Sequence, residues 1–182
     1  MLAALLSTLV NVYKSDHWLI DLEGHGREQI GDALDTSRTV GWFTCLYPIL
    51  LKLPANQDNH EVLLKEVKTQ LRSIPHYGIS FGLLRYLNQN QPLHRQGNSD
   101  ISFNYLGKID NLSNKNGIFG LSNVPTGTGL FYLQERTHFL AINAKIQDEI
   151  LQIEWSYSTN IHHDHTIENI AKTYLQYLGS LS

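Results

Sequence analysis

The order of apolar and polar positions divides the chain into alternating helical and extended segments. Residues 2–13 are almost continuously apolar and predict a buried helix, whereas the apolar run 18–22 is short enough to predict a buried strand. An amphipathic helix is predicted over residues 60–73, because apolar residues recur there at helical spacing and Pro75 ends the pattern. A second, short helix is predicted over residues 77–87.

The remaining segments add strands and a closing helix. Residues 40–53 predict a strand with a bulge at Pro48, since proline cannot donate to a strand ladder. An amphipathic helix is predicted at the end of the chain, over residues 167–181. Further strands are predicted over residues 101–106, 131–133, 137–146 and 150–158, with a hairpin turn at 147–149 and irregular loops over 88–100 and 111–129.

Helices and strands therefore interleave along the chain, and no internal repeat or linker separates them. This order predicts an α/β fold with a mixed β-sheet flanked by helices. The length of 182 residues suits one structural unit, so residues 1–182 are expected to form a single domain or one lobe of a larger one.

Composition narrows the classes of function. A net charge of −3 without a basic cluster argues against nucleic-acid binding. The apolar run at residues 2–13 is too short to cross a bilayer and has no basic segment before it, so we expect neither a membrane span nor a signal peptide. The single cysteine, Cys45, excludes an internal disulfide and is consistent with a cytoplasmic location.

The first candidate site is the segment Glu23–Glu28, which follows the predicted strand 18–22. Two glycines separate a carboxylate, a histidine and an arginine, and glycine allows both a sharp turn and the close approach of a ligand. Polar side chains at the end of a buried strand stand on rigid support, which favours a functional site. A tight turn with solvated side chains explains the segment alone equally well.

Three further segments, Arg38–Pro48, Pro75–Leu87 and Phe103–Gly107, follow Glu23–Glu28 in order. Together the four resemble the C-terminal half of the epimerization domains of nonribosomal peptide synthetases, which are relatives of condensation domains. The resemblance extends over the whole chain. The third segment departs from the family pattern in two neighbouring positions, with serine where glycine is usual and phenylalanine where tyrosine is usual.

The resemblance implies one lobe of a two-lobed fold like that of chloramphenicol acetyltransferase. It implies L-to-D epimerization of an aminoacyl or peptidyl thioester on a peptidyl carrier protein, whose 4'-phosphopantetheine arm is supplied by that partner rather than held as a bound cofactor. The His-His-x-x-x-Asp motif of the family belongs to the N-terminal lobe, which is expected to be a partner and is absent from this sequence. Residues 161–165 do not have the spacing of that motif.

The resemblance also assigns roles to individual residues. Glu23 would be one acid/base group, Arg27 would hold its carboxylate or the pantetheine phosphate, and Tyr105 would donate to the enolate oxygen. Removing and returning an α-proton next to a thioester requires such groups within hydrogen-bond reach. Residues expected to line the substrate channel or support these groups are His25, Gly24, Gly26, Arg38 and Asn104.

Structural roles stand beside the functional ones. Tyr105 on sequence alone suits a core tyrosine with a satisfied hydroxyl group, and Arg38 suits an ion pair. Trp42 is interpreted as a core anchor, and Asn104 also has a structural interpretation. The histidines at 162, 163 and 165 could suggest a metal site, but Asp164 as a helix N-cap makes a solvated loop the favoured interpretation.

Two other functions remain open at this point. A condensation domain would form peptide bonds, and a non-catalytic module would only dock carrier proteins or a second lobe. The segment Glu23–Glu28 favours epimerization. We also expect self-association, because the face toward the missing lobe, including the helix 2–13 and the surface around Glu23 and Tyr105, should expose apolar area.

Overall fold

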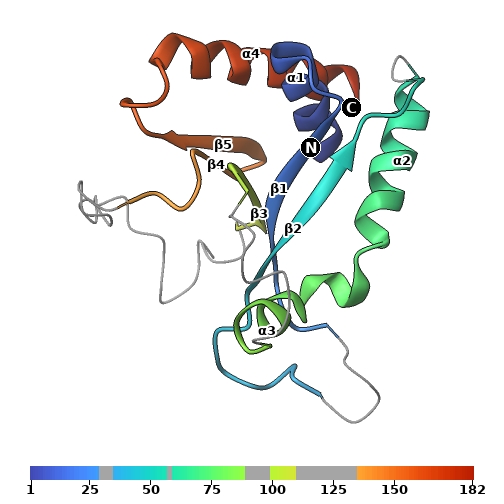
Figure 1. Ribbon diagram of the computed structural model, residues 1–182, viewed down its shortest axis with the longest axis vertical. Helices are drawn as coiled ribbons and strands as arrows, with labels where there is room; N and C mark the ends of the chain where they lie inside the picture. The colour runs from blue at the N-terminus through green and yellow to red at the C-terminus, as the bar shows by residue number, and fades with distance from the viewer. Residues whose placement is uncertain (29–34, 57–58, 89–98, 110–134) are drawn as a thin grey trace.

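A five-stranded mixed sheet forms the centre of the protein. The computed structural model describes residues 1–28, 35–56, 59–88, 99–109 and 135–182. The strands lie in the order β2-β1-β3-β4-β5, so β2 and β5 are the edges of the sheet (Figure 1). Their bounds are β1 His17–Gly24, β2 Cys45–Lys52, β3 Ile101–Lys108, β4 Leu140–Gln147 and β5 Ile150–Tyr157.

Both strand directions occur in the sheet. β1 pairs with β2 and β4 with β5 in antiparallel fashion, whereas β1–β3 and β3–β4 are parallel. The β4–β5 hairpin turns through Asp148 and Glu149, whose φ angles are 52° and 60°. Two consecutive positive φ values are the geometry of the tight turns that join twisted antiparallel strands. The predicted mixed sheet and the predicted hairpin are confirmed.

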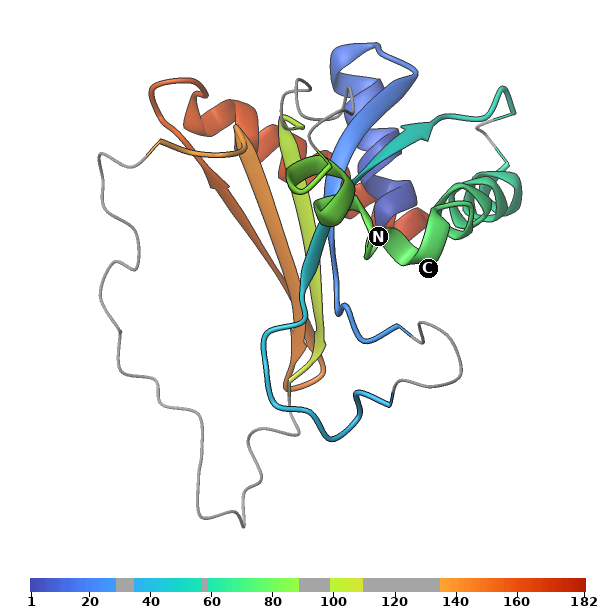
Figure 2. The ribbon, with the colours of Figure 1, turned by 60° about the horizontal axis from the view of Figure 1, so that its bottom comes forward.

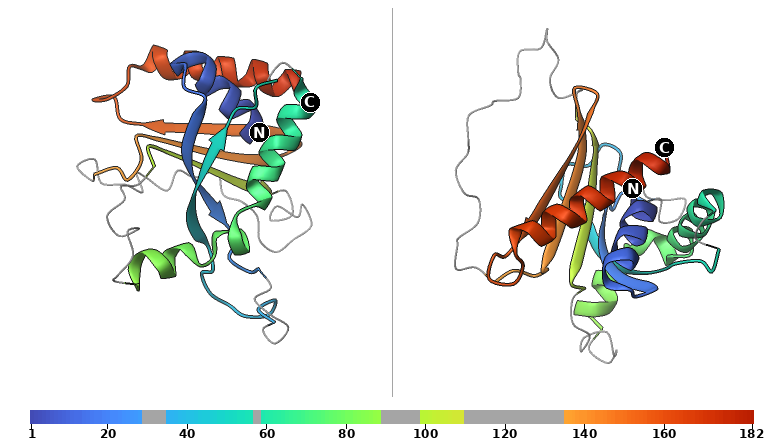
Figure 3. Two further views of the ribbon diagram at one scale, coloured as in Figure 1. Left: turned by 45° about the vertical axis from the view of Figure 1, so that its right-hand side comes forward. Right: turned by 90° about the horizontal axis from the view of Figure 1, so that it is seen from above.

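Helices cover one face of this sheet. The helices on that face are α1 Leu2–Tyr13, α2 His60–Arg72 and α4 Asp164–Ser180, whereas the short helix α3 Phe81–Tyr86 follows a 3-10 turn over Pro75–Gly78 and packs against β2. α1 and α4 lie next to each other across the strands, and α2 runs along the side of β2 (Figures 1 and 3). One apolar cluster joins α1, α2 and α4 to the sheet.

Side-chain alternation gives the two faces of the sheet different characters. On β1, Ile20 and Leu22 join the core under the helices, while Asp21 and Glu23 point to the other side. On β3, Ile101 and Phe103 belong to the core. We call the helix-packed side the covered face and the other side the open face.

Several predicted boundaries need correction. Residues 40–44 are not part of a strand, and Trp42, expected to be a core anchor, is 90% exposed. Pro48 makes no bulge, because it pairs with Asp21 in a continuous register. β2 is an edge strand, so a proline there can face away from β1, where no further strand requires its missing N–H. Asp164 is the first residue of α4 rather than its N-cap, and its carboxylate accepts a hydrogen bond from the Tyr157 hydroxyl at 2.8 Å.

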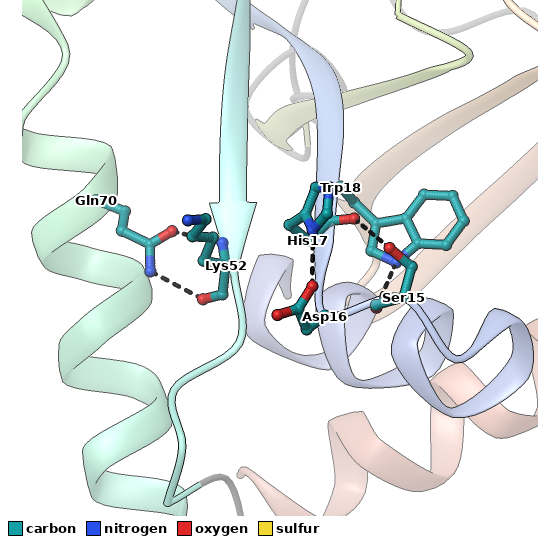
Figure 4. Close-up of polar contacts among 6 residues, drawn as sticks. All are labelled: Ser15, Asp16, His17, Trp18, Lys52 and Gln70. Atoms are coloured by element: carbon teal, nitrogen blue, oxygen red, sulfur yellow. Dashed lines mark hydrogen bonds and ion pairs between the residues drawn. The ribbon is translucent and has the colours of Figure 1, made fainter.

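α2 partly covers the outer edge of β2, the edge that faces away from β1. The side-chain amide of Gln70 accepts from the Lys52 N–H at 2.8 Å and donates to the Lys52 carbonyl at 2.9 Å (Figure 4). It thus occupies both backbone groups of one edge residue, as a neighbouring strand would. Near the start of β1, the His17 ring contacts the Asp16 carboxylate at 2.7 Å (Figure 4).

α1 is the most buried helix, contrary to the expectation that it would lie on an exposed inter-lobe surface. Leu5, Leu6 and Leu9 have no exposed surface, because α1 packs between the sheet and α4. Within the described ranges, no helix has the length and apolarity required to cross a membrane. The predicted strand 131–133 and the loop 111–129 lie outside those ranges, as does most of the loop 88–100.

Candidate functional site

Glu23 stands at the end of β1, on the open face. Its side chain is exposed, and it follows three buried residues of the same strand. Gly24 comes next, where a Cβ would lie 3.1 Å from the Cys45 sulfur and 3.2 Å from the Tyr47 ring. Contacts this close leave little room for a side chain. The strand therefore carries the carboxylate to the surface on a rigid backbone, as the sequence predicted.

Asn104 holds the Glu23 carboxylate. Its side-chain amide nitrogen donates to Oε2 of Glu23 at 2.8 Å, although the two residues are 81 positions apart. The contact arises because β3 runs parallel to β1 beside it, which places Asn104 next to Glu23 on the same face. A hydrogen bond to a carboxylate restricts its orientation. Asn104 therefore positions one oxygen of the candidate acid/base group.

Tyr105 lies on the other side of the sheet from Glu23. Successive residues of a strand point to opposite faces, so Tyr105 follows Phe103 toward the covered face. Its register partner on β4 is Ala144, a buried core residue. Tyr105 is nevertheless 47% exposed, because it lies near the end of the strand. The structure thus does not bring Tyr105 to Glu23, and it does not place Tyr105 in the core either.

Arg27 contacts a loop and not Glu23. Its guanidinium group donates to the carbonyl oxygens of Thr36 and Thr39, the latter at 2.9 Å, and lies 4.1 Å from the centre of the Phe43 ring. These contacts fix the chain that leads into β2. The guanidinium group of Arg27 is therefore directed to this loop and not to the Glu23 carboxylate, and the alternative role, binding of the pantetheine phosphate, stays a prediction.

Gly26 is required for this arrangement. Its φ is +64°, and a Cβ would lie 1.5 Å from the carbonyl oxygen of Phe43. Next to it, Nδ1 of His25 accepts the Arg27 N–H at 3.0 Å, and Nε2 faces the Glu28 carboxylate at 3.0 Å. The proton of the neutral ring consequently lies on Nε2. His25 closes the turn, which makes it a supporting residue of the segment.

Arg38 has no part in these contacts. It is exposed, and the salt bridges found in the described parts of the chain do not include it. The histidines at positions 162, 163 and 165 belong to no group of three potential metal ligands in the described residues. His163 and His165 stack on each other, with ring centres 5.8 Å apart.

A buried pair that the sequence analysis missed lies close to Glu23. Nε2 of His138 is 2.8 Å from Oδ2 of Asp21, and their side chains are 11% and 7% exposed. Both residues line a cavity of about 410 Å³ beside α3. The sequence contains a signal for Asp21, because its carboxylate interrupts an otherwise apolar strand. His138 had none, because it comes from a loop 117 residues away in sequence.

Two groups near this cavity have altered acidity. Burial raises the pKa of the Cys45 thiol and also that of the Tyr47 phenol. Both groups therefore remain protonated near neutral pH, and the Cys45 thiol lacks the thiolate character that a nucleophilic cysteine requires.

The chain is similar to known proteins over its whole length. The model of the Condensation domain family matches residues 1–182. The chain belongs to this family. The epimerization domain from the third module of tyrocidine synthetase B matches with a TM-score of 0.86 and 35% identity, covering 99% of this chain and 40% of that one.

Other members of the condensation family are more distant in sequence and share the fold. The condensation domain of the monacolin K polyketide synthase aligns with a TM-score of 0.67 at 14% identity, over 97% of this chain and 39% of that chain. The predicted fold, a mixed sheet flanked by helices with the architecture of chloramphenicol acetyltransferase, is confirmed.

Sequence relatives are much longer proteins. A linear gramicidin synthase of Brevibacillus parabrevis is 40% identical over 185 residues, which is all of this chain and 2% of that protein. Bacitracin synthase 3 of Bacillus licheniformis is 36% identical over all of this chain and 3% of that protein. The condensation-family chain thus spans a small fraction of the curated relatives it matches.

Proposed function

We propose that this chain is the C-terminal lobe of an epimerization domain, which inverts the α-carbon of an aminoacyl or peptidyl thioester on a carrier protein. The observation that carries the proposal is the Glu23 carboxylate on the open face, oriented by Asn104 at 2.8 Å. The motif Glu23–Glu28 supports it, as does the higher similarity to an epimerization domain, at 35% identity, than to a starter condensation domain, at 12%.

The chemistry assigned to Glu23 is proton transfer at the α-carbon. A carboxylate accepts the α-hydrogen as a proton, and the electron pair of the broken C–H bond moves into the thioester carbonyl to form an enolate. A proton delivered to the opposite face then gives the opposite configuration at the α-carbon. Glu23 can serve one face of the substrate, and we assign the other face to a group on the N-terminal lobe.

The proposal includes a partner. The substrate would arrive on the 4'-phosphopantetheine arm of a peptidyl carrier protein, and the open face, which carries Glu23, would border the channel between the lobes. Family membership alone also accommodates peptide-bond formation by a condensation domain. The two functions differ in what happens to the α-hydrogen, so an isotope experiment separates them.

The test uses the complete two-lobed domain and a carrier protein loaded with an L-aminoacyl group in deuterated water. Mass spectrometry follows deuterium entry at the α-carbon. Because general acid–base catalysis contributes about 10²–10⁴-fold, Glu23→Gln should slow exchange by about that factor. Exchange at the parental rate in Glu23→Gln, or peptide-bond formation without exchange in the parental domain, would contradict the proposal.

Glu154 offers a matched control. It lies on the same face in the same row of the sheet, beyond Asn104 and Asn143. With strands about 4.8 Å apart, it stands roughly 14 Å from Glu23, too far to share a proton. Glu154→Gln removes the same charge from the open face, and we expect it to leave the exchange rate unchanged.

A further inference from the structure

The cavity of about 410 Å³ beside α3 is lined by residues of β1 and β2 that lie close to Glu23, although Glu23 itself is not part of its wall. We call it the α3 cavity, and its wall includes Asp21, Leu46, Phe81, Gly82, Leu83 and His138. α3 packs against β2 at this point (Figure 2). Its volume is within the range of about 300–1,000 Å³ that small-molecule pockets have.

Two strand positions connect the α3 cavity to Glu23. Leu46 is the register partner of Glu23 across the β1–β2 pair, and directly paired residues share a face with Cβ atoms about 5 Å apart. Asp21 precedes Glu23 by two positions on β1 and therefore lies on the same face. A substrate whose α-carbon is at Glu23 would thus have the cavity within reach of its side chain.

We propose that the α3 cavity is the subsite for the side chain of the carrier-bound residue, and that it selects large apolar or aromatic side chains. This inference rests on the proposed function, because it takes the α-carbon to lie at Glu23. It adds the class of amino acid that the site accepts.

The chemistry of the cavity wall supports this class. Leu46, Phe81 and Leu83 provide apolar surface. The acidic group of the wall, Asp21, is bound to His138 at 2.8 Å, so it is not available to neutralise a charged substrate. The guanidinium group of Arg85 lies 5.8 Å from the centre of the Phe81 ring. A cationic substrate side chain would lose water without gaining a free carboxylate among the described wall residues, which is unfavourable.

Gly82 provides a way to fill the cavity. A Cβ built at this position meets no atom within 4 Å, and glycine inside α3 is a weak helix former. Gly82→Phe should therefore preserve the fold while it adds bulk at the cavity wall. Gly179 on α4 has the same open surroundings but does not line the cavity, so Gly179→Phe is its matched control.

The experiment measures binding rather than catalysis, in the complete two-lobed domain. Isothermal titration gives the affinity for two stable pantetheine amides, one of phenylalanine and one of alanine. We expect the parental domain to prefer the phenylalanine amide. In Gly82→Phe the ratio of the two affinities should fall by about tenfold or more, a typical discrimination for an apolar pocket, while Gly179→Phe keeps the parental ratio.

Leu46→Trp, on β2, places bulk in the same cavity. It provides a second test of the subsite if Gly82→Phe does not fold. Leu46 is 43% exposed, so a larger side chain is tolerated there. An unchanged affinity ratio in both variants, or no preference for phenylalanine in the parental domain, would overturn the subsite. Because binding does not require turnover, a domain that binds selectively but shows no α-deuterium exchange would instead refute the proposed function alone.

Discussion

The two faces of β1 show how one strand serves two purposes. Ile20 has no exposed surface and packs under the helices, whereas Glu23, three residues later, stands on the open face with Asn104 as its partner. The backbone is held by neighbours on both sides, β2 and β3. The covered face thus stabilises the strand that positions the carboxylate. Substitutions on alternate faces of β1 should therefore affect stability and chemistry separately.

The largest effect is expected from Ile20→Ala. Removing a fully buried aliphatic side chain loses its transfer free energy and leaves a cavity, so the free energy of unfolding should fall by about 3–4 kcal/mol. Urea denaturation of the purified chain measures this. Leu19→Ala is the control, because Leu19 lies on the opposite face, is 43% exposed and should lose less than about 1.5 kcal/mol. Equal losses for the two variants would break the comparison between the faces.

Gly26→Ala tests the turn that follows the strand. The substitution places a Cβ against the Phe43 carbonyl at a positive φ, so the turn must rearrange, at a cost of about 2–3 kcal/mol. Thermal unfolding measures the loss. Gly41→Ala is the control in the neighbouring loop, where the nearest atom is one edge of the Phe43 ring at 3.2 Å. A Gly26→Ala variant as stable as Gly41→Ala would show that the close approach is not required.

Tyr174 makes the covered face sensitive to alkaline pH. Burial raises the pKa of its phenol to about 12, and its hydroxyl has no hydrogen-bond partner among the described residues. The unfolded chain ionises this group near pH 10, so its contribution is complete below pH 10 and lost as pH rises toward 12. A difference of about two pKa units corresponds to about 2–3 kcal/mol.

Guanidinium denaturation at a series of pH values measures this loss, with Tyr174→Phe as the comparison. The variant lacks the ionisable group, so its stability should decline less between pH 10 and 12. At pH 7 it should be at least as stable as the parent, because an unsatisfied buried hydroxyl is removed. Identical alkaline slopes for the two proteins would exclude Tyr174 as the source.

The smallest effect is expected at the edge of the sheet. Gln70→Met removes the two hydrogen bonds to the backbone of Lys52 but keeps a side chain of similar length, and it should lower stability by about 1 kcal/mol. Hydrogen exchange of the Lys52 amide should accelerate as well. Gln70→Glu keeps the acceptor for that amide and loses the donor, so its exchange should be intermediate. Unchanged exchange in Gln70→Met would show that α2 does not protect the edge.

The element pattern was largely visible in the sequence. The helix 2–13 and the strands around residues 20, 103 and 142 were predicted from apolar runs and alternation, which report burial directly. The segment 40–44 was misjudged for the same reason: Val40 and Trp42 are apolar but 99% and 90% exposed. Hydrophobicity predicts burial only when some other part of the structure covers the residue.

The candidate site was predicted in part. Glu23 was identified at the end of its strand, where the structure places it, and its catalytic role stays a prediction. Arg27 was expected at the Glu23 carboxylate but binds the loop carbonyls of Thr36 and Thr39. Tyr105 and Asn104 are adjacent in sequence, and the sequence analysis favoured Tyr105 as the catalytic partner. The direction of each side chain from β3 places Asn104, and not Tyr105, at the Glu23 carboxylate, and the catalytic role of Tyr105 stays a prediction.

The sequence by itself determined which segments form helices and strands and which carboxylate emerges at the end of a buried strand, because both follow from local periodicity. Only the tertiary structure decided which residues contact Glu23 and Asp21. The contacts of Glu23 with Asn104 and of Asp21 with His138 join residues 81 and 117 positions apart. Such contacts depend on strand order and register, which fix both the neighbour and the face, and no short-range pattern encodes them.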